Sequence, residues 1–262
     1  MRYLFDAWNK VSHRLKSANH ILLLCDFDGT LTPIIDKPEL VSLASETKKI
    51  IWTLARNRRF TVGIISGRAL SDLKERVGID GVVYSGNHGL EIEGFGTNFL
   101  EPIAEEVRPF FQILSHVLTI TLRGIKGAFV ENKGLTLSVH YRSVDEAEEQ
   151  KMIDAFNKVT SPLHITGRIK ITKGKKVYEI RPPSDWNKGK AIAWLINKLK
   201  EDKVKAKALP IYLGDDLTDE DAFKVIEGYG GISIFVGADD VESAARYYLN
   251  SPDDVTEFLG ML

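Results

Sequence analysis

A short apolar run that ends abruptly at two carboxylates is the feature that most constrains the fold. Residues Ile21 to Cys25 are continuously apolar, which is typical of a strand buried on both faces of a parallel sheet. Asp26 and Asp28 follow, and their spacing of two puts both side chains on one side of an extended backbone. Because open α/β sheets bind ligands at the carboxyl ends of their strands, the pattern predicts a site there.

The residues after these carboxylates favour a sharp turn. Gly29 permits the turn, Thr30 can hydrogen-bond locally, and Pro33 cannot continue a strand. Two neighbouring carboxylates repel each other unless a cation lies between them, and hard oxygen ligands suit Mg²⁺. One carboxylate could then attack phosphorus while the other handles the proton. The alternative is that both carboxylates only cap the turn.

Two further apolar runs end in polar residues. Phe60 to Ile65 precedes Ser66 and Gly67, and Ala208 to Leu213 leads to Asp215 after one glycine. A serine hydroxyl and free backbone N–H groups at a helix start can bind an anion, although serine is also a common N-cap. The segment 45–56 between the first two runs has a helical pattern, and strand, helix, strand in this order predicts parallel strands with a right-handed crossover. The sequence therefore predicts an α/β fold.

Two other residues near predicted element ends are candidates for the site. Lys188 begins a predicted helix, where a cation is unfavourable unless it interacts with a nearby anion. The alternative is a lysine that only keeps the surface soluble. His88, with Asn87 before it, follows a short predicted strand at 82–85. His88 fits either a residue over the active site or a hydrogen-bonded loop histidine.

The pattern changes between residues 101 and 182. A predicted helix at 103–118 leads to two strands, a charged helix at 145–159 and a strand pair at 164–172 and 176–182. Prolines at 102, 182 and 183 bound this segment. We predict an inserted α+β cap domain at 101–182, and a catalytic core made of residues 1–100 and 183–262.

Composition excludes several classes of protein. The formal net charge of −1 gives no reason to expect nucleic acid as a partner. No apolar stretch approaches the roughly 18 residues of a membrane span, and no signal peptide is evident. The single cysteine, Cys25, lies in an apolar run and fits a core residue better than a catalytic thiol. We therefore expect a cytoplasmic protein without a membrane partner.

Four motifs together resemble those of the haloacid dehalogenase superfamily of phosphatases. They are DFDGTLTP, SGR, the lysine of NKGK and GDDLTDEDAF, in that order. The resemblance implies a Rossmann-like parallel-sheet core, a Mg²⁺ cofactor and an aspartyl-phosphate intermediate. It makes Asp26 the nucleophile and Asp28 the acid and base, with Asp26, Asp215 and the main-chain carbonyl of Asp28 around the metal. The residues it assigns to the phosphoryl group are Ser66, Gly67 and Lys188, with Asp216 and Asp219 supporting the metal and the lysine.

Sequence strings in the predicted cap are similar to those of trehalose-6-phosphate phosphatases. VENKGLTLSVHYR and GKKVYEIRPPSDWNKG carry this resemblance, together with GNHGLE and GDDLTDEDAF. Paired carboxylates and cations suit a ligand with many hydroxyls, which both donate and accept hydrogen bonds. The matching positions expected to contact the substrate are Asn87, His88, Glu131, Lys133, Arg142, Lys175 and Glu179. A surface ion-pair network is the alternative for the cap residues.

The resemblance implies a small sugar phosphate as the partner and a phosphatase without a fused synthase domain. The related alternatives are a sucrose-phosphate or mannosyl-phosphoglycerate phosphatase and a phosphohexomutase. An alternative from another class is a catalytically silent sugar-phosphate sensor. Such a sensor typically lacks the nucleophile or the metal carboxylate, whereas Asp26, Asp28, Lys188 and Asp215 are all present here.

Overall fold

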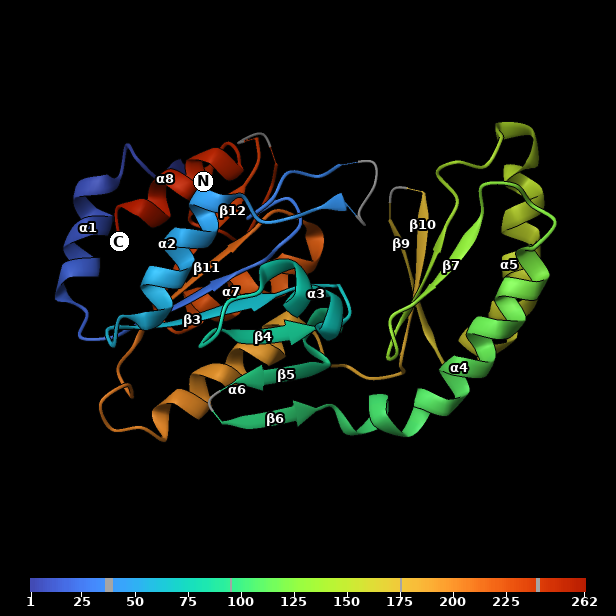
Figure 1. Ribbon diagram of the computed structural model, residues 1–262, viewed down its shortest axis with the longest axis horizontal. Coiled ribbons are helices and arrows are strands. Elements are labelled where there is room, and N and C mark those ends of the chain that lie inside the picture. Colours follow the sequence, from blue (N-terminus) through green and yellow to red (C-terminus); the bar gives the residue numbers. More distant parts are fainter. Residues whose placement is uncertain (36–39, 95, 175, 239–240) are drawn as a thin grey trace. The chain divides into compact units, whose positions relative to one another are not determined.

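The chain divides into two compact units. The computed structural model describes residues 1–35, 40–94, 96–174, 176–238 and 241–262 (Figure 1). Met1–Phe99 and Trp186–Leu262 form the first unit, and Leu100–Asp185 forms the second. The α/β architecture predicted from the sequence is confirmed.

The first unit is built on one large sheet. Within the described residues this sheet has nine strands, in the order β1-β13-β12-β11-β2-β3-β4-β5-β6. All pairs from β1 to β4 in this order are parallel, and β4 pairs with β5 in the antiparallel sense. The strands are β1 (Arg2–Tyr3), β2 (Ile21–Cys25), β3 (Phe60–Ile65), β4 (Val83–Gly86), β5 (Glu91–Gly94), β6 (Thr97–Leu100), β11 (Leu209–Gly214), β12 (Ile232–Val236) and β13 (Tyr247–Leu249).

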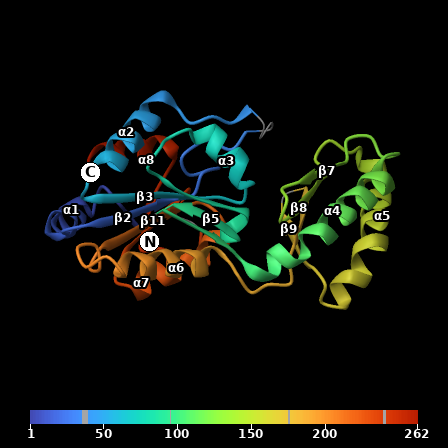
Figure 2. The ribbon, with the colours of Figure 1, turned by 60° about the horizontal axis from the view of Figure 1, so that its bottom comes forward.

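Helices cover both faces of this sheet, as the turned view shows (Figure 2). One face is covered by α1 (Trp8–Ser17), α2 (Ser45–Arg56), α3 (Leu70–Val77) and α8 (Pro252–Gly260), and the other by α6 (Lys188–Lys200) and α7 (Glu220–Gly228). Strand β2 lies in the middle and contributes to both cores, because Leu23 and Cys25 face one side while Leu22 and Leu24 face the other. This double burial explains why the strand is apolar throughout.

The second unit is a four-stranded antiparallel sheet with two helices packed against it. In the described residues the strand order is β7-β8-β10-β9. The strands are β7 (Phe129–Asn132), β8 (Leu137–His140), β9 (Lys170–Gly174) and β10 (Val177–Arg181), and the helices are α4 (Pro102–Leu122) and α5 (Glu146–Ile165). Phe111 and Leu118 of α4 pack with Phe156 of α5 and with Leu137 and Val139 of β8.

Three predicted boundaries in this unit are wrong, and the first is the end of α4, which lies at Leu122 instead of 118. Helix α5 runs to Ile165, beyond the predicted end at 159, and β9 begins at Lys170 instead of 164. Pro162 lies in the last turn of α5, where its missing N–H removes a single backbone bond. Leu163 packs against the core of the unit and favours this extra helical turn. The chain then leaves the helix at Gly167, which has a positive φ of 69°.

Candidate active site

Three neighbouring parallel strands bring polar residues to one edge of the large sheet. Strand β2 lies between β11 and β3. The strands end at Cys25, Gly214 and Ile65, so Asp26, Asp215 and Ser66 follow at the same edge. The backbone N–H of Asp26 donates to the carbonyl of Leu213 at 2.8 Å, which holds the start of this turn against β11. The predicted grouping of carboxylates thus follows from strand order.

Asp26, Asp215 and Asp219 form an acidic cluster. One carboxylate oxygen from each lies within 4.8 Å of the others. Burial raises the pKa of Asp26 well above its ordinary value; Lys188 opposes this shift, and the carboxylates of Asp219 and Asp215 reinforce it. Burial, with the negative charges of Asp219 and Asp216, raises the pKa of Asp215 to about 7. A divalent cation bound by these oxygens would relieve the repulsion.

Lys188 connects two of these carboxylates. It is the first residue of α6, its side chain is 2% exposed, and its Nζ lies 3.3 Å from Asp26 Oδ1 and 2.6 Å from Asp219 Oδ1. Although burial alone would lower it, the pKa of Lys188 is raised by Asp219 and Asp26. The ammonium group therefore stays charged next to the predicted nucleophile.

Asp219 is the most fully bonded member of the cluster. Its Oδ1 accepts hydrogen bonds from Lys188 Nζ at 2.6 Å and from the Tyr212 hydroxyl at 2.5 Å. Its Oδ2 accepts from the backbone N–H groups of Asp215 and Asp216 at 2.9 and 3.1 Å. With both oxygens engaged, Asp219 is better suited to supporting the lysine and the Asp215 turn than to holding a metal directly.

The two aspartates of the first motif have different surroundings. Both oxygens of Asp28 accept from Arg68, at 2.7 Å from Nε and 2.6 Å from Nη2. Arg68 also donates from Nη1 to Asp72 at 2.9 Å, and Asp72 pairs in turn with Arg76. Arg68 thereby fixes the orientation of the Asp28 carboxylate, whereas Asp26 faces Lys188. The sequence motif SGR contains Arg68, but its pairing with Asp28 was not predicted.

The Asn87–Gly89 turn lies over Gly67. Asn87 and His88 have positive φ values of 49° and 57°, which are unusual for residues other than glycine. The backbone N–H of His88 donates to the carbonyl of Ser66 at 2.9 Å, and a Cβ at Gly67 would lie 2.5 Å from the His88 ring. Asn87 is buried and its side-chain amide donates to Glu91 at 2.7 Å. Substrate contact by Asn87 and His88 stays a prediction.

The other predicted substrate residues belong to the second unit. Lys133 Nζ lies 3.2 Å from Glu179 Oε1, and Glu131 Oε2 lies 2.9 Å from His140 Nε2. Glu131 and Glu179 both pair in register with Ser138, so they flank one position of β8 on the two neighbouring strands. The structure therefore brings Glu131, Lys133 and Glu179 together.

Two further residues of this unit are predicted to contact the substrate. Arg142 lies beyond the end of β8 and is exposed. Lys175 lies outside the described residues, so its predicted role stays a prediction.

A mostly parallel α/β sheet with Asp26, Ser66 and Asp215 at the carboxyl ends of its strands is the arrangement of the haloacid dehalogenase-like class of phosphatases. Residues 24–253 match the family model of trehalose-phosphatase. The chain belongs to this family, and it is therefore an enzyme of the phosphoric monoester hydrolase class.

Named relatives agree with this family. "Probable trehalose-phosphate phosphatase 3" of Oryza sativa subsp. japonica is 35% identical over 273 residues, which cover 98% of this chain and 73% of the relative. "Probable trehalose-phosphate phosphatase D" of Arabidopsis thaliana is 36% identical over 252 residues, which cover 92% of this chain and 67% of the relative.

Solved structures give the same fold. The C-terminal domain of the trehalose-6-phosphate phosphatase of C. albicans aligns with a TM-score of 0.79 at 24% identity, covering 97% of this chain and 95% of that chain. The Aspergillus fumigatus trehalose-6-phosphate phosphatase, crystal form 3, aligns with a TM-score of 0.64 at 29% identity, covering 97% of this chain and 96% of that chain.

Among the helices that the structure describes, none has both the length and the apolar character of a membrane span.

Proposed function

We propose that this enzyme hydrolyses trehalose 6-phosphate to trehalose and inorganic phosphate through an aspartyl-phosphate on Asp26. The observation that carries the chemistry is the buried Asp26 carboxylate 3.3 Å from Lys188 Nζ, at the strand edge shared with Ser66 and Asp215. The substrate is proposed from family membership and from the names of the relatives. The cytoplasmic location and the lack of nucleic-acid partners stay predictions from composition.

Asp26 and Asp28 divide the chemistry between them in this proposal. An oxygen of Asp26 attacks the phosphorus, and the bond from phosphorus to the sugar oxygen breaks while Asp28 gives that oxygen a proton. Water then attacks the aspartyl-phosphate, Asp28 takes the proton from the water, and Asp26 is released. Because each Asp28 oxygen accepts one hydrogen bond from Arg68, the transferred proton would occupy the remaining lone pair of one of these oxygens.

The remaining residues at the edge stabilise charge. Lys188, the Ser66 hydroxyl and the N–H groups after β3 are proposed to hold the oxygens of the transferring phosphoryl group, where negative charge is spread in the transition state. The oxygens of Asp26 and Asp215 fit Mg²⁺, with the main-chain carbonyl of Asp28 as a proposed third protein ligand. When bound, Mg²⁺ would supply positive charge to the phosphoryl oxygens.

The stability of the metal-free protein is expected to fall as the pH rises from about 4 to about 7. The pKa of Asp215 is about 7 in the fold, against an ordinary value of 3.8. Over this interval the folded state keeps a proton that the unfolded state has released, so higher pH favours unfolding. Mg²⁺ is therefore expected to raise the melting temperature more at pH 8 than at pH 5.

This pH dependence is measured by thermal unfolding with chelator or with Mg²⁺. The chelated Asp215→Asn variant is the control, because it lacks the titrating group and should show a weaker loss of stability over the same interval. Equal Mg²⁺-induced shifts at pH 5 and pH 8 would count against a metal site at Asp215.

Gly29→Ala is expected to raise the Mg²⁺ concentration needed for activity by about tenfold or more. Gly29 has a φ of +86°, and a Cβ there would lie 2.1 Å from Asp215 Oδ2. The added methyl group must therefore displace the Asp215 carboxylate, which Thr30 holds through a 3.0 Å hydrogen bond. Activity is measured against Mg²⁺ concentration. Gly124→Ala is the control, since a Cβ there meets nothing within 4 Å, and an unchanged Mg²⁺ requirement in Gly29→Ala would contradict the prediction.

The substrate is tested by phosphate release from trehalose 6-phosphate, sucrose 6-phosphate, glucose 6-phosphate and an aryl phosphate, each with Mg²⁺ and with chelator. We expect a strong preference for trehalose 6-phosphate that is lost on chelation. Mg²⁺-dependent release that favours another sugar phosphate would support the phosphatase activity but refute trehalose 6-phosphate as the substrate. Transfer of the phosphoryl group back to sugar instead of water would indicate a mutase.

Residues 101–182 are proposed to act as the cap domain that recognises the sugar. Glu131→Ala is expected to lower kcat/KM for trehalose 6-phosphate by about tenfold or more, the typical effect of losing a hydrogen bond to a charged group. The aryl phosphate should be affected much less, because it offers no sugar hydroxyls. Glu148→Ala on α5 is the matched control, since this carboxylate pairs with Lys151 on the helix surface. Equal losses on both substrates would argue against sugar recognition by Glu131.

A further inference from the structure

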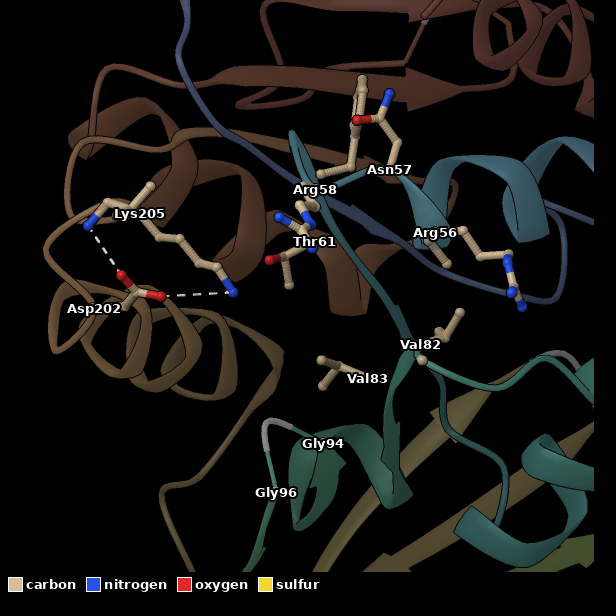
Figure 3. A pocket seen from close by; sticks show the side chains of 14 residues that line it. Arg56, Asn57, Arg58, Thr61, Val82, Val83, Gly94, Gly96, Asp202 and Lys205 are labelled. Atoms are coloured by element: carbon tan, nitrogen blue, oxygen red, sulfur yellow. Dashed lines mark hydrogen bonds and ion pairs between the residues drawn. The ribbon is translucent and has the colours of Figure 1, made fainter.

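A cavity of about 690 Å³ lies in the first unit at the amino ends of the parallel strands. Its walls come from the turn between α2 and β3, the start of β4, the end of β5 and the loop after α6 (Figure 3). Strand β3 begins in this cavity at Phe60 and ends just before Ser66 at the catalytic edge. At about 3.3 Å per residue the two positions are about 20 Å apart, so the cavity is separate from the proposed catalytic site.

The charged side chains around this cavity are mostly basic. Among the described lining residues, Arg56, Arg58 and Lys205 are positive and Asp202 is negative, which gives a formal charge of +2. The Nζ of Lys205 lies 3.8 Å from Asp202 Oδ2, and both side chains are about a third to a half exposed, so this ion pair is weak and Lys205 can exchange it for another anion. Arg58 has no ion-pair partner in the described part of the chain.

The ends of the neighbouring helices account for only part of this positive charge. Arg56 belongs to the last turn of α2, where a cation interacts favourably with the helix dipole, and its guanidinium stacks 4.7 Å from the centre of the Trp52 ring. Arg58 and Lys205 lie beyond the helices. Figure 3 shows the side chain of Lys205 extending from its loop towards Thr61 and Arg58. These two cations therefore face the same hollow from segments far apart in the sequence.

A second, smaller cavity adjoins the first. It has a volume of about 280 Å³, shares Lys205 with the larger one, and is also lined by Lys200 and Lys207. Both hollows have apolar walls beside their basic residues, formed by Val82 and Val83 in the larger cavity. A basic rim over an apolar floor suits a ligand that has an anionic group and an apolar or ring-shaped part.

We infer that the larger cavity binds a small organic phosphate, with its phosphoryl group between Arg58 and Lys205 and its organic part over Val82 and Val83. The volume is in the range of small-molecule sites, about 300–1,000 Å³. Guanidinium groups bind phosphate oxygens through two parallel hydrogen bonds, and lysine adds a compact positive charge. Sugar phosphates and nucleoside monophosphates share this chemistry, and the experiment separates them.

The test is calorimetric titration of the full chain with Mg²⁺, in an Asp26→Asn background that leaves the probes intact. The probes are inorganic phosphate, glucose 6-phosphate and adenosine monophosphate. We expect an organic phosphate to bind at two classes of site, one of which weakens by about tenfold or more in Arg58→Glu/Lys205→Glu. If glucose 6-phosphate is the probe whose second class of site weakens, the ligand is a sugar phosphate. If adenosine monophosphate is that probe, the ligand is a nucleoside monophosphate.

A matched charge reversal on exposed positions of α1 and α7, Lys10→Glu/Lys224→Glu, should keep both classes of site. Arg58→Lys/Lys205→Arg should also keep them, because it preserves both charges. Melting temperatures of all variants establish that they are folded. The inference is overturned if Arg58→Glu/Lys205→Glu binds both classes of site as tightly as its background, or if both charge reversals weaken binding equally.

Discussion

Asp26→Asn is expected to lower the rate of phosphate release from trehalose 6-phosphate by about a thousandfold or more, while substrate binding is largely kept. The amide has the shape of the carboxylate but is a poor nucleophile. Asp26 is 5% exposed and its Oδ1 lies 3.3 Å from Lys188 Nζ, which is proposed to hold the phosphoryl group. Asp219 is closer to the lysine, but both of its oxygens already accept other hydrogen bonds. Turnover is measured with saturating Mg²⁺ and substrate, and binding by calorimetry.

Two controls separate lost chemistry from lost structure. Asp6→Asn makes the same change at an exposed position near the N-terminus and should leave turnover unchanged. The metal-free Asp26→Asn protein should unfold at a temperature no lower than the parent at pH 8, because burial and the neighbouring carboxylates make a charge at Asp26 unfavourable. Residual activity above about a tenth of the parent value would exclude Asp26 as the only nucleophile.

The catalytic edge of the sheet could be predicted because its signals are local. The apolar run of β2 and the helical pattern of α2 gave the observed bounds, Ile21–Cys25 and Ser45–Arg56. The end of a buried strand then fixes where Asp26 must lie. The ends of the neighbouring parallel strands β11 and β3 fix the positions of Asp215 and Ser66 in the same way. These two residues and Asp26 therefore lie together once the strand order is known.

Contacts between distant segments could not be predicted in this way. Arg68 and Asp28 are 40 residues apart, and nothing in the SGR motif specifies that its arginine faces a carboxylate after another strand. Tyr212 offered a partial signal, since a phenol in the apolar strand LPIYLG needs a hydrogen-bond partner when buried. Its partner, Asp219, is visible only in the structure.

The positive φ values and the basic cavity are also products of three-dimensional structure. Asn87 and His88 adopt a left-handed conformation that is uncommon for residues other than glycine, and the contacts to Ser66 and Glu91 hold it. Arg58 and Lys205 come together because α2 and α6 both end at the amino edge of the sheet. No periodic pattern in the sequence relates those two helix ends.

Lys188→Met is expected to abolish most activity and to destabilise the fold. The substitution keeps a side chain of similar length but removes the cation that lies 2.6 Å from Asp219 and 3.3 Å from Asp26. Breaking a buried ion pair by removing one partner costs about 3–5 kcal/mol, because the remaining charge stays buried. The expected result is a lower free energy of unfolding together with a large loss of kcat.

Lys190→Met on the same helix is the matched control, since Lys190 is exposed and the same change there should affect neither quantity strongly. Lys188→Met/Asp219→Asn separates the two effects of Lys188. Removing the second buried charge should restore part of the stability, because Asp219 no longer needs a cation, but it cannot restore the contact with the phosphoryl group. Recovery of stability without activity would assign Lys188 to both roles. Recovery of both would show that the lysine acts on the reaction only through the fold.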